Sequence, residues 1–192
     1  MVVTMKTGNR HHGFTLIELL VSLTVLGIAL GLAAPGMADL MRNNRLVAES
    51  DRLLADLRYA RSEAVKRRVS VIICRSADPL DDSPVCSGNP NDWSTGWIVF
   101  ASGDTNTTYQ SDIDTLLRVA RPTEGGITIG VNNAANTHIE FAMDGSLNPS
   151  QTGRYAICDN RGASYGRLVE VSPSGRPRRL PNTTPSSCTN PT

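Results

Sequence analysis

Residues 13–34 read GFTLIELLVSLTVLGIALGLAA, and this stretch decides how the rest of the chain is arranged. Between Phe14 and Ala34 the only charged side chain is that of Glu18. A helix needs about 20 apolar residues to cross the hydrocarbon core of a bilayer, so the stretch is long enough to span a membrane. A carboxylate inside such a helix costs on the order of a few kcal/mol, which indicates a function for it. We therefore predict a membrane helix whose acid awaits a positively charged partner.

The segment in front of this helix is basic, with Lys6, Arg10, His11 and His12. Basic residues beside a first span favour the cytoplasmic side of the membrane. A secretory signal peptide would be cut after the apolar run, where the small residues 33–38 offer only a weak site. A cut between Gly13 and Phe14 would instead leave the helix attached and create an α-amine four residues before Glu18. In a bundle of such helices, the amine of one chain would meet Glu18 of its neighbour.

The helical pattern continues beyond the span, over residues 35–68. Pro35 and Gly36 predict a kink and not an end, because the pattern resumes at once. An apolar stripe with a period near 3.6 follows on an otherwise charged segment. Its members are Leu40, Leu46, Val47, Leu53, Leu54, Leu57, Ala60, Arg61 and Ala64. We interpret the remaining charges as a solvated face with helical pairs such as Glu63 with Arg67.

Residues 69–192 predict an antiparallel β domain with an irregular tail over 181–192. Short runs rich in β-branched and aromatic residues predict strands at 69–74, 96–101, 115–120, 127–131, 137–143, 154–158 and 167–171. Asp144-Gly145 predicts a hairpin turn. The fold class is therefore α+β, with the outer half of one long N-terminal helix packed on a C-terminal antiparallel β domain.

Four cysteines, Cys74, Cys86, Cys158 and Cys188, all follow the span, which suits an oxidising compartment on the far side of the membrane. They contain no C-x-x-C pair and have no histidine nearby, so a zinc site is not expected. Three disulfide connectivities exist. We favour Cys74–Cys86 and Cys158–Cys188, because each pair follows a strand and closes a loop.

Enzyme chemistry finds little support in the sequence, and no catalytic residue, metal or cofactor is predicted. No nucleophile elbow, P-loop or dinucleotide fingerprint occurs. His138 lies in a strand-like run and is interpreted as a histidine on the surface of a strand edge. Asp104-Thr-Asn106 and Asp112-Ile-Asp114 lack the regular ligand spacing and the closing Glu of a calcium loop.

The run Gly13-Phe14-Thr15-Leu16-Ile17-Glu18-Leu19-Leu20 closely resembles the class III signal of type IV pilins and type II secretion pseudopilins. The later runs Trp93-Ser-Thr-Gly-Trp-Ile-Val-Phe100 and Arg167 to Arg178 resemble the minor pseudopilins grouped as GspH/FimT. This resemblance implies a pilin-like fold and four segments: a leader over 1–13, a membrane and filament-core helix over 14–34, its amphipathic continuation over 35–68, and a periplasmic β-rich domain over 69–192.

The resemblance also implies a function. A prepilin peptidase would cut after Gly13 and methylate the new N-terminus at Phe14, and Glu18 would dock the subunit. The chain would wait in the bacterial inner membrane and then join other pilins or pseudopilins in a filament, near its tip or its initiating complex.

Two alternatives stay open. Gly175-Arg176-Pro177-Arg178-Arg179 resembles the arginine-rich stretch of DNA-binding minor pilins, so Arg167, Arg176, Arg178 and Arg179 are candidate contacts to duplex DNA, carried on a flexible segment. These arginines would otherwise keep the last strand soluble or contact acidic neighbours. A membrane-anchored enzyme or sensor would keep its leader, which starts at Met1 or Met5. The sequence does not separate a type IV pilus from a type II secretion system.

Overall fold

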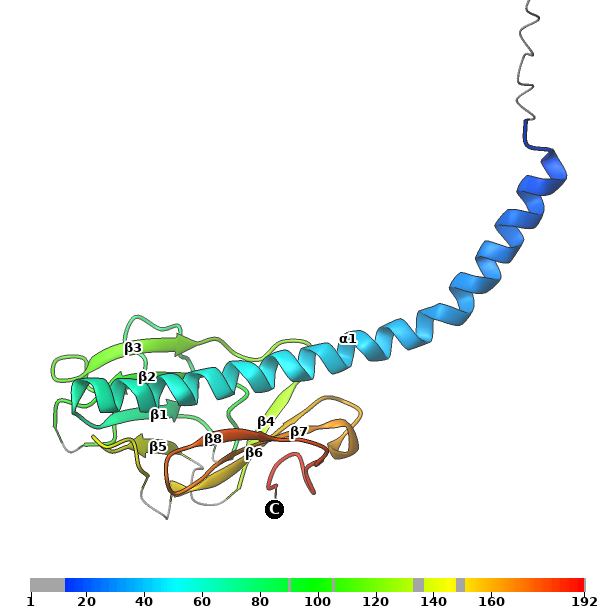
Figure 1. Ribbon diagram of the computed structural model, residues 1–192. Coiled ribbons are helices and arrows are strands. Elements are labelled where there is room, and N and C mark those ends of the chain that lie inside the picture. The colour runs from blue at the N-terminus through cyan, green and yellow to red at the C-terminus, as the bar shows by residue number, and fades with distance from the viewer. Residues whose placement is uncertain (1–12, 90, 105, 133–136, 148–150, 192) are drawn as a thin grey trace, which may run out of the picture. The chain divides into compact units, whose positions relative to one another are not determined.

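The computed structural model describes residues 13–89, 91–104, 106–132, 137–147 and 151–191. The predicted leader lies outside these residues except for Gly13. The chain divides into two units, residues 1–41 and 42–192. A single helix, α1 (Leu16–Arg67), contributes to both (Figure 1).

The first half of α1 is apolar. Every side chain between residues 16 and 32 is exposed. The helix continues without a break through Pro35, so the prediction that it does not end there is confirmed. Within the described residues, α1 is the one helix long and apolar enough to cross a membrane.

The second half of α1 buries one face. Six apolar side chains of this half lie in the main core, namely Leu46, Leu53, Leu54, Leu57, Ala60 and Ala64. Leu40 is exposed and Val47 is only half-buried, so the predicted stripe was placed one turn too early. Ser50 lies on the buried face between Leu46 and Leu53, and its hydroxyl donates a hydrogen bond to the carbonyl of Val47 at 2.8 Å.

In the part of the chain that the structure describes, eight strands form two four-stranded antiparallel sheets. The first sheet has the order β3-β2-β1-β5, from β3 (Thr115–Ala120), β2 (Trp97–Ala101), β1 (Val71–Arg75) and β5 (His138–Phe141). The second sheet has the order β4-β6-β7-β8, from β4 (Thr128–Val131), β6 (Gly153–Cys158), β7 (Arg167–Val171) and β8 (Pro177–Leu180). A short 3₁₀ helix, η3 (Ala163–Tyr165), lies between β6 and β7. Seven of these strands match the predicted ones, and β8 was not predicted.

Residues alternate between the two faces of each sheet. In β1, Val71 and Ile73 enter the main core with α1, whereas Ile72 and Cys74 enter a second cluster on the opposite face. In the second sheet, Tyr155 belongs to the main core and Ala156 belongs to a third cluster. Both sheets therefore bury side chains on two faces, which explains the nearly continuous apolar runs of β1 and β2.

A polar cluster joins α1 to the first sheet. The carboxylate of Asp56 accepts a hydrogen bond from the indole of Trp97 at 2.9 Å and forms an ion pair with Arg118. The guanidinium of Arg118 also lies 4.3 Å from the ring centre of Tyr59. Because Asp56 is buried, these two donors replace the water that its carboxylate loses. The cluster fixes the position of the helix along the sheet.

Candidate functional site: the N-terminal helix and the C-terminal hairpin

The residues that begin α1 form a helix cap. Thr15 precedes the first helical residue, and its hydroxyl accepts a hydrogen bond from the backbone N–H of Glu18 at 3.3 Å. The carbonyl of Thr15 accepts from the N–H of Leu19 at 3.1 Å, so Thr15 is the N-cap. The sequence argument missed this role, although the pattern Thr-x-x-Glu is the signature of a capping box.

Gly13 and Phe14 lie outside the helix, and the side chain of Phe14 is 81% exposed. Glu18 follows in the first turn, where a negative charge is favoured by the helix dipole. The side chain of Glu18 is exposed on an apolar helix. The hydroxyl of Thr24, in contrast, donates to the carbonyl of Leu20 at 2.8 Å. The acid is therefore the charged group of this segment, and its carboxylate has no partner among the described residues.

The four candidate DNA-binding arginines have different surroundings, and they do not project from a flexible segment. Residues 177–180 form β8, which pairs with β7 in a hairpin. Arg178 pairs with Glu170 at 2.7 Å, and Arg179 pairs with Asp51 of α1 at 3.1 Å. Arg167 donates to the carbonyls of Tyr165 and Gly166.

Arg176 differs from the other three. It lies in the turn before β8, next to Gly175, whose positive φ of 68° suits the turn. Its side chain is exposed and makes no hydrogen bond or ion pair with the described residues. Hydrogen bonds from Arg178, and to a smaller extent from Arg154, hold the pKa of the Glu170 carboxyl below its usual range. The ion pairs of Arg178 and Arg179 thus stabilise the domain, whereas Arg176 is available for an external anion.

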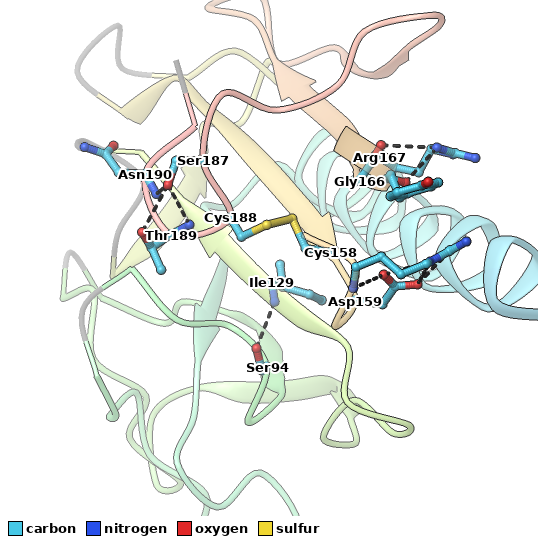
Figure 2. The surroundings of a disulfide bond; sticks show 12 residues. Ser94, Ile129, Cys158, Asp159, Gly166, Arg167, Ser187, Cys188, Thr189 and Asn190 are labelled. Carbon is cyan, nitrogen blue, oxygen red and sulfur yellow. Dashed lines mark hydrogen bonds and ion pairs between the residues drawn. A yellow bond between two sulfur atoms is a disulfide. The ribbon is translucent and has the colours of Figure 1, made fainter. Parts of the chain in front are cut away.

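Both favoured disulfides are present, Cys74–Cys86 and Cys158–Cys188. The second one holds the C-terminal segment on the outer face of the second sheet (Figure 2). A Cβ atom at Gly130 of β4 would collide with the carbonyl of Cys188, and one at Gly166 would approach Pro185. The residues after β8 are irregular, as predicted, but they are packed against the sheet.

His138 and the candidate calcium loop have local structural roles. His138 lies on β5, which is an edge strand of the first sheet as predicted, but its side chain is half-buried and not on the surface. Burial lowers the pKa of its imidazole. The carboxylate of Asp114 accepts from the backbone N–H groups of Gly103 and Gln110, so it shapes the loop between β2 and β3. Among the described residues, no group of three His, Cys, Asp or Glu side chains could hold a metal ion.

An apolar helix that carries one early acid, and whose second half packs on antiparallel sheets, defines a pilin-like subunit. Comparison with known families supports this class. The family described as Type II transport protein GspH matches residues 49–175, and the prokaryotic N-terminal methylation motif matches residues 8–34. The chain therefore belongs to the GspH family, and the minor pseudopilin resemblance seen in the sequence is confirmed.

Solved structures agree with this assignment. Two crystal forms of the type IV minor pilin FimU from Pseudomonas aeruginosa PAO1 are similar to this chain. The first has 28% sequence identity and a TM-score of 0.59, and the match covers 78% of this chain and 98% of FimU. The second has 27% identity and a TM-score of 0.54, with coverage of 73% and 98%. The chain matches none of the curated proteins compared with it.

Proposed function

We propose that this protein is a minor pilin or pseudopilin that a prepilin peptidase cuts after Gly13 and methylates at Phe14. The processed chain waits in the inner membrane with residues 42–192 in the periplasm. It then enters the tip or the initiating complex of a type IV pilus or a type II secretion pseudopilus. The family and its methylation motif support the general role.

The observation that carries this proposal is the position of Glu18. Its carboxylate is exposed in the first turn of an apolar helix, four residues after Phe14. In hydrocarbon this charge costs on the order of a few kcal/mol. A cut after Gly13 creates a cationic amine at Phe14, and both residues are exposed and precede the helix, so a peptidase can reach the bond.

Docking then follows from electrostatics. Within one chain the carboxylate already faces its own helix N-terminus, which favours it but leaves no full positive charge beside it. In a bundle of processed helices, the methylated amine of a neighbouring subunit supplies that charge in a medium of low dielectric constant. Assembly thus removes the cost of an unpaired acid in lipid and sets the axial register between subunits.

The test is Glu18→Ala, with Thr24→Ala as the matched control. Thr24 lies on the same helix, and its hydroxyl donates a hydrogen bond to the backbone carbonyl of Leu20 in that helix. We expect Glu18→Ala to be cut and methylated normally, as shown by mass spectrometry of the N-terminus. Its incorporation into sheared filaments should fall about tenfold or more, since 1.4 kcal/mol of lost pairing is one factor of ten. Normal incorporation of this variant would disprove the docking role, and an uncut Met1 or Met5 terminus would disprove the processing.

A second candidate function is binding of duplex DNA, and the free side chain of Arg176 favours it. Arg178 and Arg179 are exposed as well, although each is paired with an acid. Contacts to phosphates neutralise charge and weaken as salt is added. A mobility-shift titration with duplex DNA should show salt-sensitive binding that Arg176→Ala weakens more than Arg167→Ala, whose guanidinium is held by carbonyls. Absence of a shift at low salt would rule out this candidate.

A further inference from the structure

A basic groove lies beside the end of α1. Arg58, Arg61 and Lys66 of α1 line one side, and Arg176 lines the other side. Two apolar side chains, Val65 and Pro177, complete the lining together with the acid Asp144. Val65 is 49% exposed, which is unusual for an aliphatic side chain beside so many charges. The groove therefore offers cations around a small apolar surface.

The groove is held in shape by backbone contacts. The Nε of Arg61 donates to the carbonyl of Gly145 at 3.0 Å. Gly145 and Gly175 both have positive φ values, and a Cβ atom at Gly175 would collide with the carbonyl of Gly145. The two turns and the helix are thus in close contact. Arg58 and Arg176 have no side-chain partner among the described residues, so they are available to a ligand.

The same unit also carries an acidic surface loop, residues 77–85, which we call the acidic knob. Its charge is opposite to that of the groove. Its sequence is ADPLDDSPV, and Asp78, Asp81 and Asp82 are all exposed. Leu80 among them is 56% exposed. From residue 76 to residue 117 the sequence contains seven acids and no Lys or Arg.

The acidic knob is also anchored at both ends. The Cys74–Cys86 disulfide closes the loop that contains it, and Pro79 and Pro84 are buried. A Cβ atom at Gly96 would press against the ring of Pro79, so this proline packs closely on the start of β2. The exposed Leu80 and its flanking carboxylates are therefore presented from a fixed base.

The knob and the groove lie at opposite ends of the first sheet. The knob follows Arg75 at the end of β1 (Figure 1). The groove lies at the other end, where Val71 pairs with Phe141 and the turn at Gly145 follows. Five strand residues span about 16 Å, so the two surfaces do not meet within one chain. Two copies displaced along the direction of β1 would bring one knob to the next groove.

We propose that the acidic knob of one copy of this protein binds the basic groove of a second copy. Arginine side chains bind carboxylates in a planar, two-pronged geometry, and Leu80 would cover the exposed Val65. Such a contact joins two different surfaces, so it differs from the self-complementary interface of a two-fold symmetric dimer. The contact gives the proposed filament subunit a second docking site, outside the membrane helix.

An acidic protein surface fits the groove better than a nucleic acid does. Among the described residues, no aromatic side chain lines the groove for base stacking. The exposed Val65 matches an aliphatic partner instead. The charge of the knob complements the groove within the same chain, so no further protein is needed to supply the partner.

Lysine chemistry makes this contact measurable. The chain has two lysines, Lys6 in the predicted leader and Lys66 in the groove. A carbodiimide joins a lysine amine to a carboxylate that touches it. The full-length chain would be prepared in detergent as a mixture of normal and heavy-isotope copies, cross-linked and mapped by mass spectrometry. We expect mixed-isotope peptides that join Lys66 to the acidic knob, and Lys66→Arg should abolish them while it keeps the charge.

Charge reversal supplies the matched variants. Asp81→Arg with Asp82→Arg, or Arg58→Asp with Arg176→Asp, should each lower the intermolecular yield about tenfold, as like charges face each other. A mixture of the reversed-knob and reversed-groove chains should regain it. The buried Trp93 and Trp97 report by fluorescence that each variant is folded. Cross-links of Lys66 only to Glu63 of its own helix, or no recovery in the mixture, would overturn the proposal.

The outcome is separable from that of the proposed function. Glu18→Ala should lose filament incorporation and still give the knob-to-groove cross-link in detergent. A chain that loses the cross-link but enters filaments normally would overturn the contact and leave the filament role in place. Protection of Lys66 by duplex DNA, without any cross-link between copies, would assign the groove to nucleic acid and overturn the contact as well.

Discussion

The outer faces of the two sheets are covered in different ways. On the first sheet, Ile72, Cys74, Ile98 and Phe100 lie under the loop between β2 and β3, where Tyr109 meets the ring of Phe100. On the second sheet, Ala156, Cys158 and Leu168 lie under residues that follow the last strand. A disulfide lies in each of these clusters, but it spans 12 residues in the first case and 30 in the second. The first cover is local, whereas the second depends on a distant part of the chain.

This difference predicts that the second disulfide stabilises the domain more than the first does. Replacing both Cys158 and Cys188 with alanine should lower the free energy of unfolding by about 3.5 kcal/mol from loop entropy over 30 residues. The outer face of the second sheet should also become accessible to an apolar dye. Urea unfolding of the full-length chain, followed by fluorescence of the buried tryptophans, measures the change. A loss smaller than that of the other disulfide would reverse the comparison.

Removal of the first disulfide should have a smaller effect. Replacing Cys74 and Cys86 with alanine should cost about 3 kcal/mol for a loop of 12 residues. We expect no increase in dye binding, because Tyr109 and its loop still cover Phe100. The same urea titration gives the energy, and dye binding equal to that of the Cys158/Cys188 variant would show that the two covers do not differ.

A substitution at Gly130 tests the second cover without changing a cysteine. Alanine there meets the carbonyl of Cys188, so either β4 or the C-terminal segment must move. Overpacking of this kind costs about 1–3 kcal/mol. Thr128→Ala is the control, because Thr128 is exposed on the same strand. Equal stability of the two variants would show that the segment does not pack tightly on β4.

The smallest expected effect concerns the ion pairs at the edge of the second sheet. Arg178 and Arg154 hold the pKa of the Glu170 carboxyl low in the folded state, so the unfolded chain binds more protons in acid. The stabilisation is complete above the ordinary Glu value of about 4.3 and is lost as the pH falls through the lower folded value. Glu170→Gln should therefore cost under about 1 kcal/mol at neutral pH and nothing at low pH.

Urea unfolding of wild type and Glu170→Gln at a series of pH values measures this effect. Arg178→Ala should remove most of the same pH dependence, and the double variant should add little further loss. A difference between Glu170→Gln and wild type that grows on acidification would contradict the assigned sign.

Much of this fold could be predicted from local patterns, and the exceptions have physical causes. Most of the seven predicted strands contain β-branched residues and are buried on one or both faces, whereas β3 is mostly exposed. The strand β8 contains Pro177, Arg178 and Arg179, which resemble a loop, but Pro177 lies at an edge where a missing N–H costs little. Its pairing with β7 also depends on Glu170, which no local pattern links to Arg178.

The sequence pattern also could not predict that the strands form two separate sheets. Strands buried on both faces lack the alternation that would have assigned them to a side. The ion pair between Asp56 and Arg118 joins residues 62 positions apart, and neither position suggests the other. The misplaced start of the apolar stripe has a similar cause, because Leu40 continues the period but has no sheet to pack on within its own unit.

The candidate site shows the same limits. Gly13, Phe14 and Glu18 form a short contiguous motif, so the sequence was sufficient to single them out. The two disulfide pairings followed from the positions of the cysteines after strands. Only the structure distinguishes Arg176 from the other three arginines. The partners of Arg178 and Arg179 are Glu170 of a neighbouring strand and Asp51 of the helix, which the sequence pattern does not link to them.

The Cys158–Cys188 bridge has a consequence for the biogenesis of the protein. Cys188 follows all eight described strands in chain order, so the partner of Cys158 becomes available only after every one of these strands has been synthesised. The Cys74–Cys86 bridge needs only the chain up to residue 86. A chain arrested before Cys188 would therefore carry the first bridge and a free thiol at Cys158.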